Sequence, residues 1–201
     1  MAFFRSASFS DSLPAIVGEG VMLRAPQTGD YAAWAELREA SRDFLVPWEP
    51  TWPADDLTRG AFRRRLRRYA DDQRMDLSYP FFLFRRDNGL LLGGLTIANV
   101  RRGVAQAGSL GYWIGLPYAH SGFMTAAVAA LIPFAFTTLR LHRLEAACIP
   151  TNTASIRLLE KSGFEREGYA REYLCIHGAW QDHLLYARLD RPRRTVDQEG
   201  P

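Results

Sequence analysis

Residues 110–163 read LGYWIGLPYAHSGFMTAAVAALIPFAFTTLRLHRLEAACIPTNTASIRLLEKSG and contain two successive transitions from a strand to a helix. In the first, the apolar run 110–114 leads through a turn with Gly122 into a long, alanine-rich helix. In the second, the apolar run 144–149 leads into a helix that Asn152 caps and Gly163 ends. The first N–H groups of a helix have no internal partner and carry partial positive charge, so the glycine turn predicts a pyrophosphate site.

The composition is typical of one soluble globular domain. The chain has 201 residues, of which 47% are hydrophobic and 23% are charged. It contains no apolar run of the roughly 20 residues that a membrane helix needs, and its first residues lack the apolar core of a signal peptide. We therefore expect a cytoplasmic protein. The net charge of +3 suits an acidic ligand but does not indicate nucleic acid.

The two cysteines and four histidines show no spacing typical of a metal site, so we predict that the protein binds no metal. Cys148 and Cys175 both lie in apolar runs. We expect buried free thiols rather than a disulfide.

The remaining segments predict a single α/β domain with seven strands. The expected strands cover residues 21–24, 80–86, 90–100, 106–114, 144–149, 164–176 and 181–189, and the expected helices cover residues 31–41, 57–73, 123–139 and 153–162. Asp55 and Asp56 can cap the second helix, Asn88-Gly89 is typical of a hairpin turn, and Pro133 predicts a kink near residues 129–133. We expect a flexible arm over residues 1–19, the domain over 20–190, and a polar tail over 191–201.

Two segments allow a structural and a functional interpretation. Residues 46–53, VPWEPTWP, cannot continue a helix, and they form either a rigid packed loop or one wall of a substrate pocket. The helix over residues 57–73 is either a solvated face or a weak contact for RNA or an acidic partner. Its arginines are Arg59, Arg63, Arg64, Arg65, Arg67 and Arg68.

The order of elements, together with Gly122 and Asn152, resembles the GNAT superfamily of acyl-CoA N-acetyltransferases. The local sequences GYWIG, HRLEAA, NTASIRLLEKSGFEREGYAREYL and GAWQDHLLYA are similar to the ribosomal-protein-alanine (RimJ/RimL-type) branch, and the resemblance covers residues 21–189. It implies a mostly antiparallel central sheet, splayed between its fourth and fifth strands, with helices on both faces. It also implies acetyl-CoA as donor and a primary amine as acceptor, most of all the N-terminal alanine of a ribosomal protein.

For the donor, the resemblance implies a site made mostly of main chain. The pantetheine arm of the family pairs with the strand before the glycine turn, and the pyrophosphate lies in the turn. The corresponding residues here are Trp113, Ile114, Gly115, Leu116, His120, Ser121, Gly122, Phe123, Met124, Thr125 and Asn152. The family pattern Arg/Gln-x-x-Gly-x-Gly/Ala has Ala119 at its first position and Met124 at its last, so one side-chain contact is missing, and His120 or Ser121 could replace it. Gly122 and Asn152 could each also serve only to start a helix.

For the chemistry, the resemblance implies the N–H of Ile114 as oxyanion donor. The tyrosine that many members use to protonate the leaving thiolate is replaced by Leu159. Some RimL-type members instead use a serine three residues after the asparagine, so the resemblance implies Ser155 in this role, although Ser155 could also only satisfy a backbone donor. Glu145 and Glu49 are candidates for the general base. Glu145 could equally pair with an arginine, and a water chain without a dedicated base is a further alternative.

The acceptor channel is assigned to aromatic and acidic residues, which could equally pack in the core: Trp48, Glu49, Trp52 and Tyr173. Two other functions stay open at this point. One is acetylation of a small amine such as an antibiotic or an amino acid. The other is a non-catalytic module that binds acyl-CoA or RNA, and we expect a monomer or a homodimer in each case.

Overall fold

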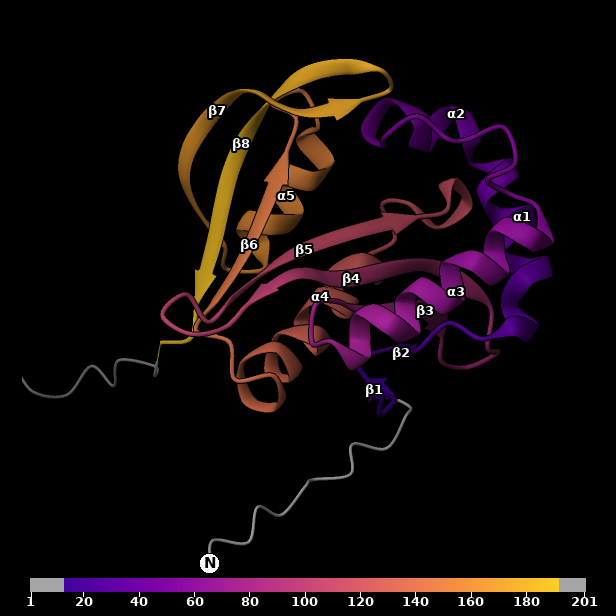
Figure 1. The fold of residues 1–201 in the computed structure, drawn as a ribbon, viewed down its shortest axis with the longest axis horizontal. Helices are drawn as coiled ribbons and strands as arrows, with labels where there is room; N and C mark the ends of the chain where they lie inside the picture. The colour runs from indigo at the N-terminus through magenta and orange to yellow at the C-terminus, as the bar shows by residue number, and fades with distance from the viewer. Residues whose placement is uncertain (1–12, 192–201) are drawn as a thin grey trace, which may run out of the picture.

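The computed structural model describes residues 13–191, which form one open sheet of eight strands with helices on both faces (Figure 1). The predicted tail from residue 192 and the first twelve residues of the predicted arm lie outside the described residues. In chain order the elements are β1 (Ile16–Val17), β2 (Val21–Arg24), η1 (Thr28–Asp30), α1 (Tyr31–Ala40), α2 (Arg42–Leu45), η2 (Val46–Trp48), α3 (Arg59–Arg74), β3 (Tyr79–Arg85), β4 (Leu91–Arg101), β5 (Ala107–Ile114), η3 (Leu116–Tyr118), α4 (Phe123–Pro133), η4 (Phe134–Thr138), β6 (Arg143–Cys148), α5 (Thr153–Lys161), β7 (Glu165–Ile176) and β8 (Ala179–Leu189).

The sheet has the order β1-β2-β3-β4-β5-β6-β8-β7, and every neighbouring pair is antiparallel except β5 and β6. These two parallel strands pair only from Ala107–Ser109 to Arg143–Glu145. Beyond that register they separate, because β5 stays on β4 while β6 stays on β8. The expected mostly antiparallel sheet, splayed between its fourth and fifth predicted strands, is confirmed.

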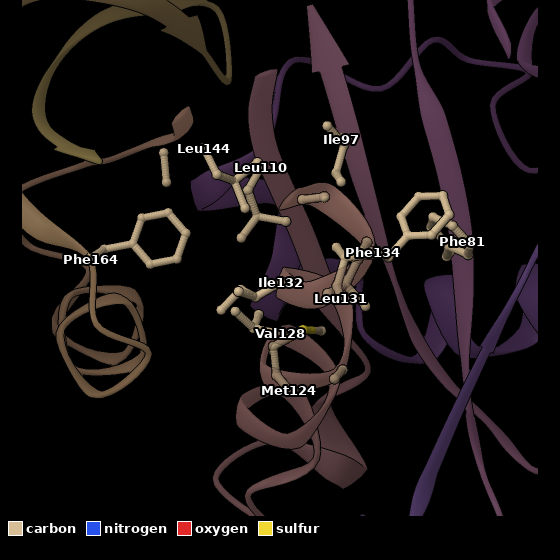
Figure 2. Packing of buried hydrophobic residues seen from close by; sticks show 14 of the residues in the cluster. Phe81, Ile97, Leu110, Met124, Val128, Leu131, Ile132, Phe134, Leu144 and Phe164 are labelled. Atoms are coloured by element: carbon tan, nitrogen blue, oxygen red, sulfur yellow. The ribbon is translucent and has the colours of Figure 1, made fainter. Parts of the chain in front are cut away.

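Two hydrophobic layers cover the sheet. β3 contributes to both, because its apolar run alternates: Phe81 and Leu83 face the layer of α4, and Phe82 and Phe84 face the layer of α1 and α3. Figure 2 shows the larger layer, in which side chains of α4 lie against those of β3, β4, β5 and β6. The sheet therefore fixes α4 and α5 on one face and α1 and α3 on the other.

The end of the long helix differs from its prediction. Helical backbone continues to Thr138, close to the predicted end at residue 139, but its type changes after Pro133, where the π-helix η4 follows α4 directly. The ring of a proline removes the bond to the carbonyl four residues back. The chain adjusts through a wider turn, in which the Leu139 N–H donates to the Phe134 carbonyl over 3.0 Å.

Three other expectations need correction. β1 lies inside the predicted arm, because Ile16 and Val17 pair with β2. Asp55 and Asp56 do not cap α3: the Thr58 hydroxyl accepts from the Ala61 N–H, and the two aspartates pair with Arg64 and Arg65. Both cysteines are free, but only Cys148 is buried; Cys175 is exposed because β7 is the edge strand of the sheet.

Candidate active site

A cavity of about 480 Å³ opens where β5 and β6 separate. Its walls come from four segments: the end of α2 with η2, the end of β5, the turn into α4, and the first turns of α5. The lining residues are Phe44, Leu45, Trp48, Glu49, Tyr112, Trp113, Ile114, Tyr118, Ala119, His120, Gly122, Phe123, Met124, Thr125, Thr151, Asn152, Thr153, Ala154, Ser155, Arg157, Leu158 and Lys161. The fold thus brings together most of the predicted donor-site residues.

The N-terminus of α4 faces this cavity without a side-chain cap. Gly122 precedes the helix with a φ of +82°, and a Cβ placed there would meet nothing within 4 Å. The first bond of the helix is from the Ala126 N–H to the Gly122 carbonyl. The N–H groups of the three residues between them therefore have no partner in the helix and can bind an anion.

The N-terminus of α5 lines the opposite part of the cavity and is capped. The Asn152 side chain accepts from the Ser155 N–H over 3.0 Å, which confirms Asn152 as the N-cap. Gly163 ends the helix with a φ of +76°, as expected. Arg157 and Lys161 also line the cavity, and neither was predicted from the sequence to belong to the donor site. The two residues lie four positions apart and therefore on the same face of α5, which was a signal available in the sequence.

The main chain of β5 offers fewer free groups than the resemblance implied. The Gly115 N–H donates to the Leu92 carbonyl over 2.8 Å, and the Leu116 N–H donates to the Ser41 hydroxyl over 2.9 Å. Neither Gly115 nor Leu116 is among the residues that line the cavity. Because bonding directions alternate along an antiparallel pair, the backbone groups of Ile114 and Tyr112 point away from β4, toward the splay.

Trp113 reaches the cavity from the other face of β5, in the layer of α1 and α3. It can lie against β4 because two glycines stand opposite. A Cβ on Gly93 would lie 2.3 Å from the Trp113 carbonyl oxygen, and one on Gly94 would lie 2.7 Å from its indole nitrogen. The Gly-Gly pair therefore permits the close approach of two strands.

Tyr112 is a cavity residue that the motif comparison missed, although it lies inside the GYWIG run. Burial raises the pKa of the Tyr112 phenol to about 12, and a hydrogen bond with the Ser155 hydroxyl acts in the opposite direction. The phenol thus stays protonated at neutral pH. Ser155 and Tyr112 together place two hydroxyl groups at the splay.

The structure does not bring Glu145 to this cavity. Its carboxylate pairs with Arg101 and with Arg143, where the Nε–Oε1 distance is 2.9 Å. Arg143 also pairs with Glu167 on β7, and these bonds raise the pKa of its guanidinium. Glu145 lies at the last paired position of β5 and β6, and these ion pairs agree with the alternative interpretation of Glu145 as an arginine partner.

Of the predicted acceptor residues, Trp48 and Glu49 line the cavity, whereas Trp52 and Tyr173 do not. Trp52 lies behind Glu49 and donates its indole N–H to that carboxylate over 2.7 Å. The Tyr173 ring packs edge-on against His183, with 5.8 Å between ring centroids. Ser121 also lies outside the lining, and its hydroxyl donates to the Ala119 carbonyl over 3.3 Å.

Within residues 13–191, no group of three His, Cys, Asp or Glu side chains is placed to hold a metal ion. No helix of this part of the chain is long and apolar enough to cross a membrane.

Comparisons with known proteins agree on one family. The sequence profile described as acetyltransferase (GNAT) domain matches residues 21–165. The ribosomal protein uS5-alanine N-acetyltransferase of Escherichia coli (strain K12) is 36% identical over 160 residues, which cover 79% of this chain and 82% of the relative.

Two solved structures share the whole fold. Ribosomal-protein-S5-alanine acetyltransferase from Vibrio fischeri has a TM-score of 0.82 at 30% identity, covering 88% of this chain and 97% of that one. RimJ of Mycobacterium smegmatis, in complex with CoA-disulfide, has a TM-score of 0.82 at 33% identity, covering 89% of this chain and 87% of that one. The chain therefore belongs to the acetyltransferases of the GNAT family.

Proposed function

We propose that this protein transfers the acetyl group of acetyl-CoA to the N-terminal amine of a protein, with the N-terminal alanine of a ribosomal protein as the acceptor. One observation carries the proposal: the cavity at the splay has an uncapped helix N-terminus at one part and the Glu49 carboxylate at another. The first suits the phosphates of a CoA donor, and the second suits a cationic amine. The relatives named for ribosomal-protein alanine support the choice of acceptor.

In this proposal the N–H groups of Phe123, Met124 and Thr125 bind the pyrophosphate of acetyl-CoA. Arg157 and Lys161 add positive charge to the same cavity. Because the main chain supplies most of the contacts, the departures at Ala119 and Met124 leave the site intact. The cytoplasm is the proposed compartment of the reaction.

The transfer step uses groups at the splay. The Ile114 N–H donates to the thioester carbonyl oxygen as negative charge develops on it. The amine nitrogen forms the new C–N bond while the C–S bond breaks, and the Ser155 hydroxyl gives its proton to the sulfur. Of the two protons that the ammonium loses, one is returned to Ser155 through Tyr112, and the other goes to solvent.

A panel of amines tests the proposed function. Each is incubated with acetyl-CoA and the protein, and the released thiol is measured. We expect turnover with an Ala-started peptide and none with antibiotics, free amino acids or the same peptide with a blocked N-terminus. Turnover only with a small amine would replace the acceptor, and the absence of any increase in melting temperature with acetyl-CoA would overturn the donor as well.

We also propose that α3 makes a weak contact with RNA. Its exposed Arg63 and Arg67 line a surface cavity of about 570 Å³ together with Arg64. Arg64 pairs with Asp55, whereas Arg63 and Arg67 have no acidic partner among the described residues. Two guanidinium groups one helical turn apart suit successive phosphates of a nucleic-acid strand.

A further inference from the structure

The carboxylate of Glu49 is the most constrained charged group at the cavity. Arg38 donates to both of its oxygens, over 2.8 Å to Oε1 and 2.6 Å to Oε2. Trp52 donates its indole N–H to Oε2 over 2.7 Å. A carboxylate has about four acceptor positions, so these three bonds leave one position, on Oε1, for a further donor.

Arg38 is held as firmly as its partner. Only 5% of the residue is exposed, although it carries a permanent charge. Its guanidinium lies 4.1 Å from the ring centroid of Trp52 and 5.0 Å from that of Trp113. Its Nε is buried without a hydrogen-bond partner in the described structure. A buried charge of this kind needs a counter-ion, and Glu49 supplies it.

The main chain of Glu49 is fixed as well. Its carbonyl accepts from the His177 N–H over 2.9 Å, which ties the segment after η2 to the turn between β7 and β8. The side chain keeps 21% of its surface exposed and lines the cavity together with Trp48 and Trp113. An oriented carboxylate beside two indoles is complementary to a cation, because the face of an aromatic ring also attracts positive charge.

We propose that Glu49 is the subsite for the α-ammonium group of the acceptor and that Arg38 is its positioning residue. This inference rests on the proposed function and names the contact that selects its substrate. The free position on Oε1 accepts one N–H of the ammonium group, and Arg38 holds the carboxylate so that this position faces the cavity. Glu49 therefore binds and orients the nitrogen and accepts neither of the two protons that it loses, of which one returns to Ser155 through Tyr112 and the other goes to water.

The positions of these residues on the two faces of the sheet support the role of Glu49 as the ammonium subsite. Arg38 and Trp113 lie in the layer of α1 and α3, whereas Ser155 belongs to α5 in the other layer. An ammonium at Glu49 thus approaches the splay from the face opposite to the proposed donor. The nitrogen and the leaving sulfur then lie on opposite sides of the thioester carbon.

Two peptides of equal size test the subsite. One begins with alanine, and the other has a hydroxyl in place of the α-amine, which makes it neutral. Their dissociation constants are measured by calorimetry with the CoA-bound protein. We expect the wild-type chain to bind the amine about tenfold more tightly, as is typical of a hydrogen bond between charged groups, and Glu49→Gln to lose this preference.

Two further variants separate the subsite from general damage. Glu39→Gln removes the carboxylate of an exposed pair with Arg42 on the same segment, outside the cavity, and should keep the preference. Trp52→Phe removes one of the three hydrogen bonds but leaves the ion pair, so it should fold and reduce the preference severalfold. If Glu49→Gln does not fold, the result for Trp52→Phe decides: an unchanged preference overturns the subsite.

Steady-state kinetics distinguish an anchor from a base. For an anchor, Glu49→Gln raises KM for the acceptor about tenfold and leaves KM for acetyl-CoA unchanged. A loss of about 10²–10⁴ in kcat with unchanged acceptor affinity would make Glu49 the base and overturn the inference. Transfer by the wild-type chain with an unchanged preference in Glu49→Gln would overturn the subsite alone. Absence of transfer to any N-terminal amine would overturn the proposed function itself.

Discussion

The two walls of the cavity are built in different ways. The proposed donor wall consists mainly of backbone groups, from the start of α4, the start of α5 and the free edge of β5. The proposed acceptor wall depends on side chains: Trp48 and Glu49 line the cavity, and Arg38 and Trp52 hold the Glu49 carboxylate from outside the lining through three hydrogen bonds. A wall of backbone groups is supplied by the fold, so we expect it to keep its function despite the departures from the family pattern at Ala119 and Met124. A side-chain wall depends on the identity of each residue, so it is where the protein can select its substrate.

The acceptor wall should be the more fragile one. Arg38→Ala leaves the Glu49 carboxylate without its counter-ion, and loss of one partner of a buried pair typically costs about 3–5 kcal/mol of stability. Urea unfolding should show this loss in Arg38→Ala, and Arg42→Ala, which breaks an exposed pair, should behave like the wild-type chain. Equal stability of the two variants would mean that the pair of Arg38 and Glu49 contributes no more to the free energy of unfolding than an exposed ion pair.

On the donor wall, the largest effect should come from its few side chains. Ser155→Ala removes the proposed proton donor of the leaving sulfur, so kcat should fall about 100-fold while the dissociation constant of acetyl-CoA stays within twofold. Stopped-flow and equilibrium titration give the two quantities. Thr153→Ala, at another lining position of α5, is the control. An unchanged kcat would remove Ser155 from the mechanism.

The Tyr112 phenol gives this wall a signature in alkaline solution. Its pKa is raised from 10.0 to about 12 in the folded chain, so between these values the folded state holds a proton that the unfolded state has lost. Stability should therefore fall as pH rises from about 10 to 12, by roughly 2–3 kcal/mol. Unfolding at several pH values should show a shallower fall in Tyr112→Phe. Because the pKa of Tyr79 is also raised to about 12, the stability of Tyr112→Phe should still fall somewhat with pH. If the wild-type chain and Tyr112→Phe lose stability equally with pH, the Tyr112 phenol is exposed to solvent rather than buried.

The backbone origin of the donor wall can be tested at one N–H group. Phe123→Pro removes the N–H at the first helical position, where proline is tolerated, and Phe123→Ala removes the ring but keeps the N–H. The proline variant should bind acetyl-CoA about tenfold more weakly than the alanine variant, as for one hydrogen bond to a charged group. Equal affinities, measured by calorimetry, would show that side chains hold the phosphates.

The difference between the two walls also explains which features could be predicted from the sequence: local backbone motifs could be, and side-chain contacts between distant segments could not. The strand–turn–helix pattern around Gly122 and the cap at Asn152 are local signals, and both proved correct. The pairing of Arg38 with Glu49 is not visible in the sequence, because it depends on how α1 packs against the loop after η2. The position of Glu145 outside the cavity was not predictable for a related reason: a polar residue on a strand does not reveal at which end of the splay it lies. The Leu116 N–H donates to the Ser41 hydroxyl, and these two residues are 75 positions apart in the sequence. A hydrogen bond over this separation could not be predicted from the sequence.

The smallest effect concerns a surface outside both walls. If α3 contacts RNA, Arg63→Ala combined with Arg67→Ala should weaken binding of a single-stranded RNA severalfold at low salt and reduce the slope of log affinity against log salt by about 1.4. Acetylation of a peptide should not change. Arg74→Ala, in a pair with Asp71 at the far end of the helix, is the control. An unaltered salt slope would assign these arginines to a solvated face.

The most direct measurement of the central claim is the position of the acetyl group on a peptide that offers two amines. The peptide begins with alanine and contains one internal lysine, and tandem mass spectrometry follows its reaction with acetyl-CoA and the wild-type chain. The proposed function predicts a single added acetyl group on the α-amine of the alanine. Acetylation of the lysine instead, or of the same peptide after its N-terminus has been blocked, would contradict it.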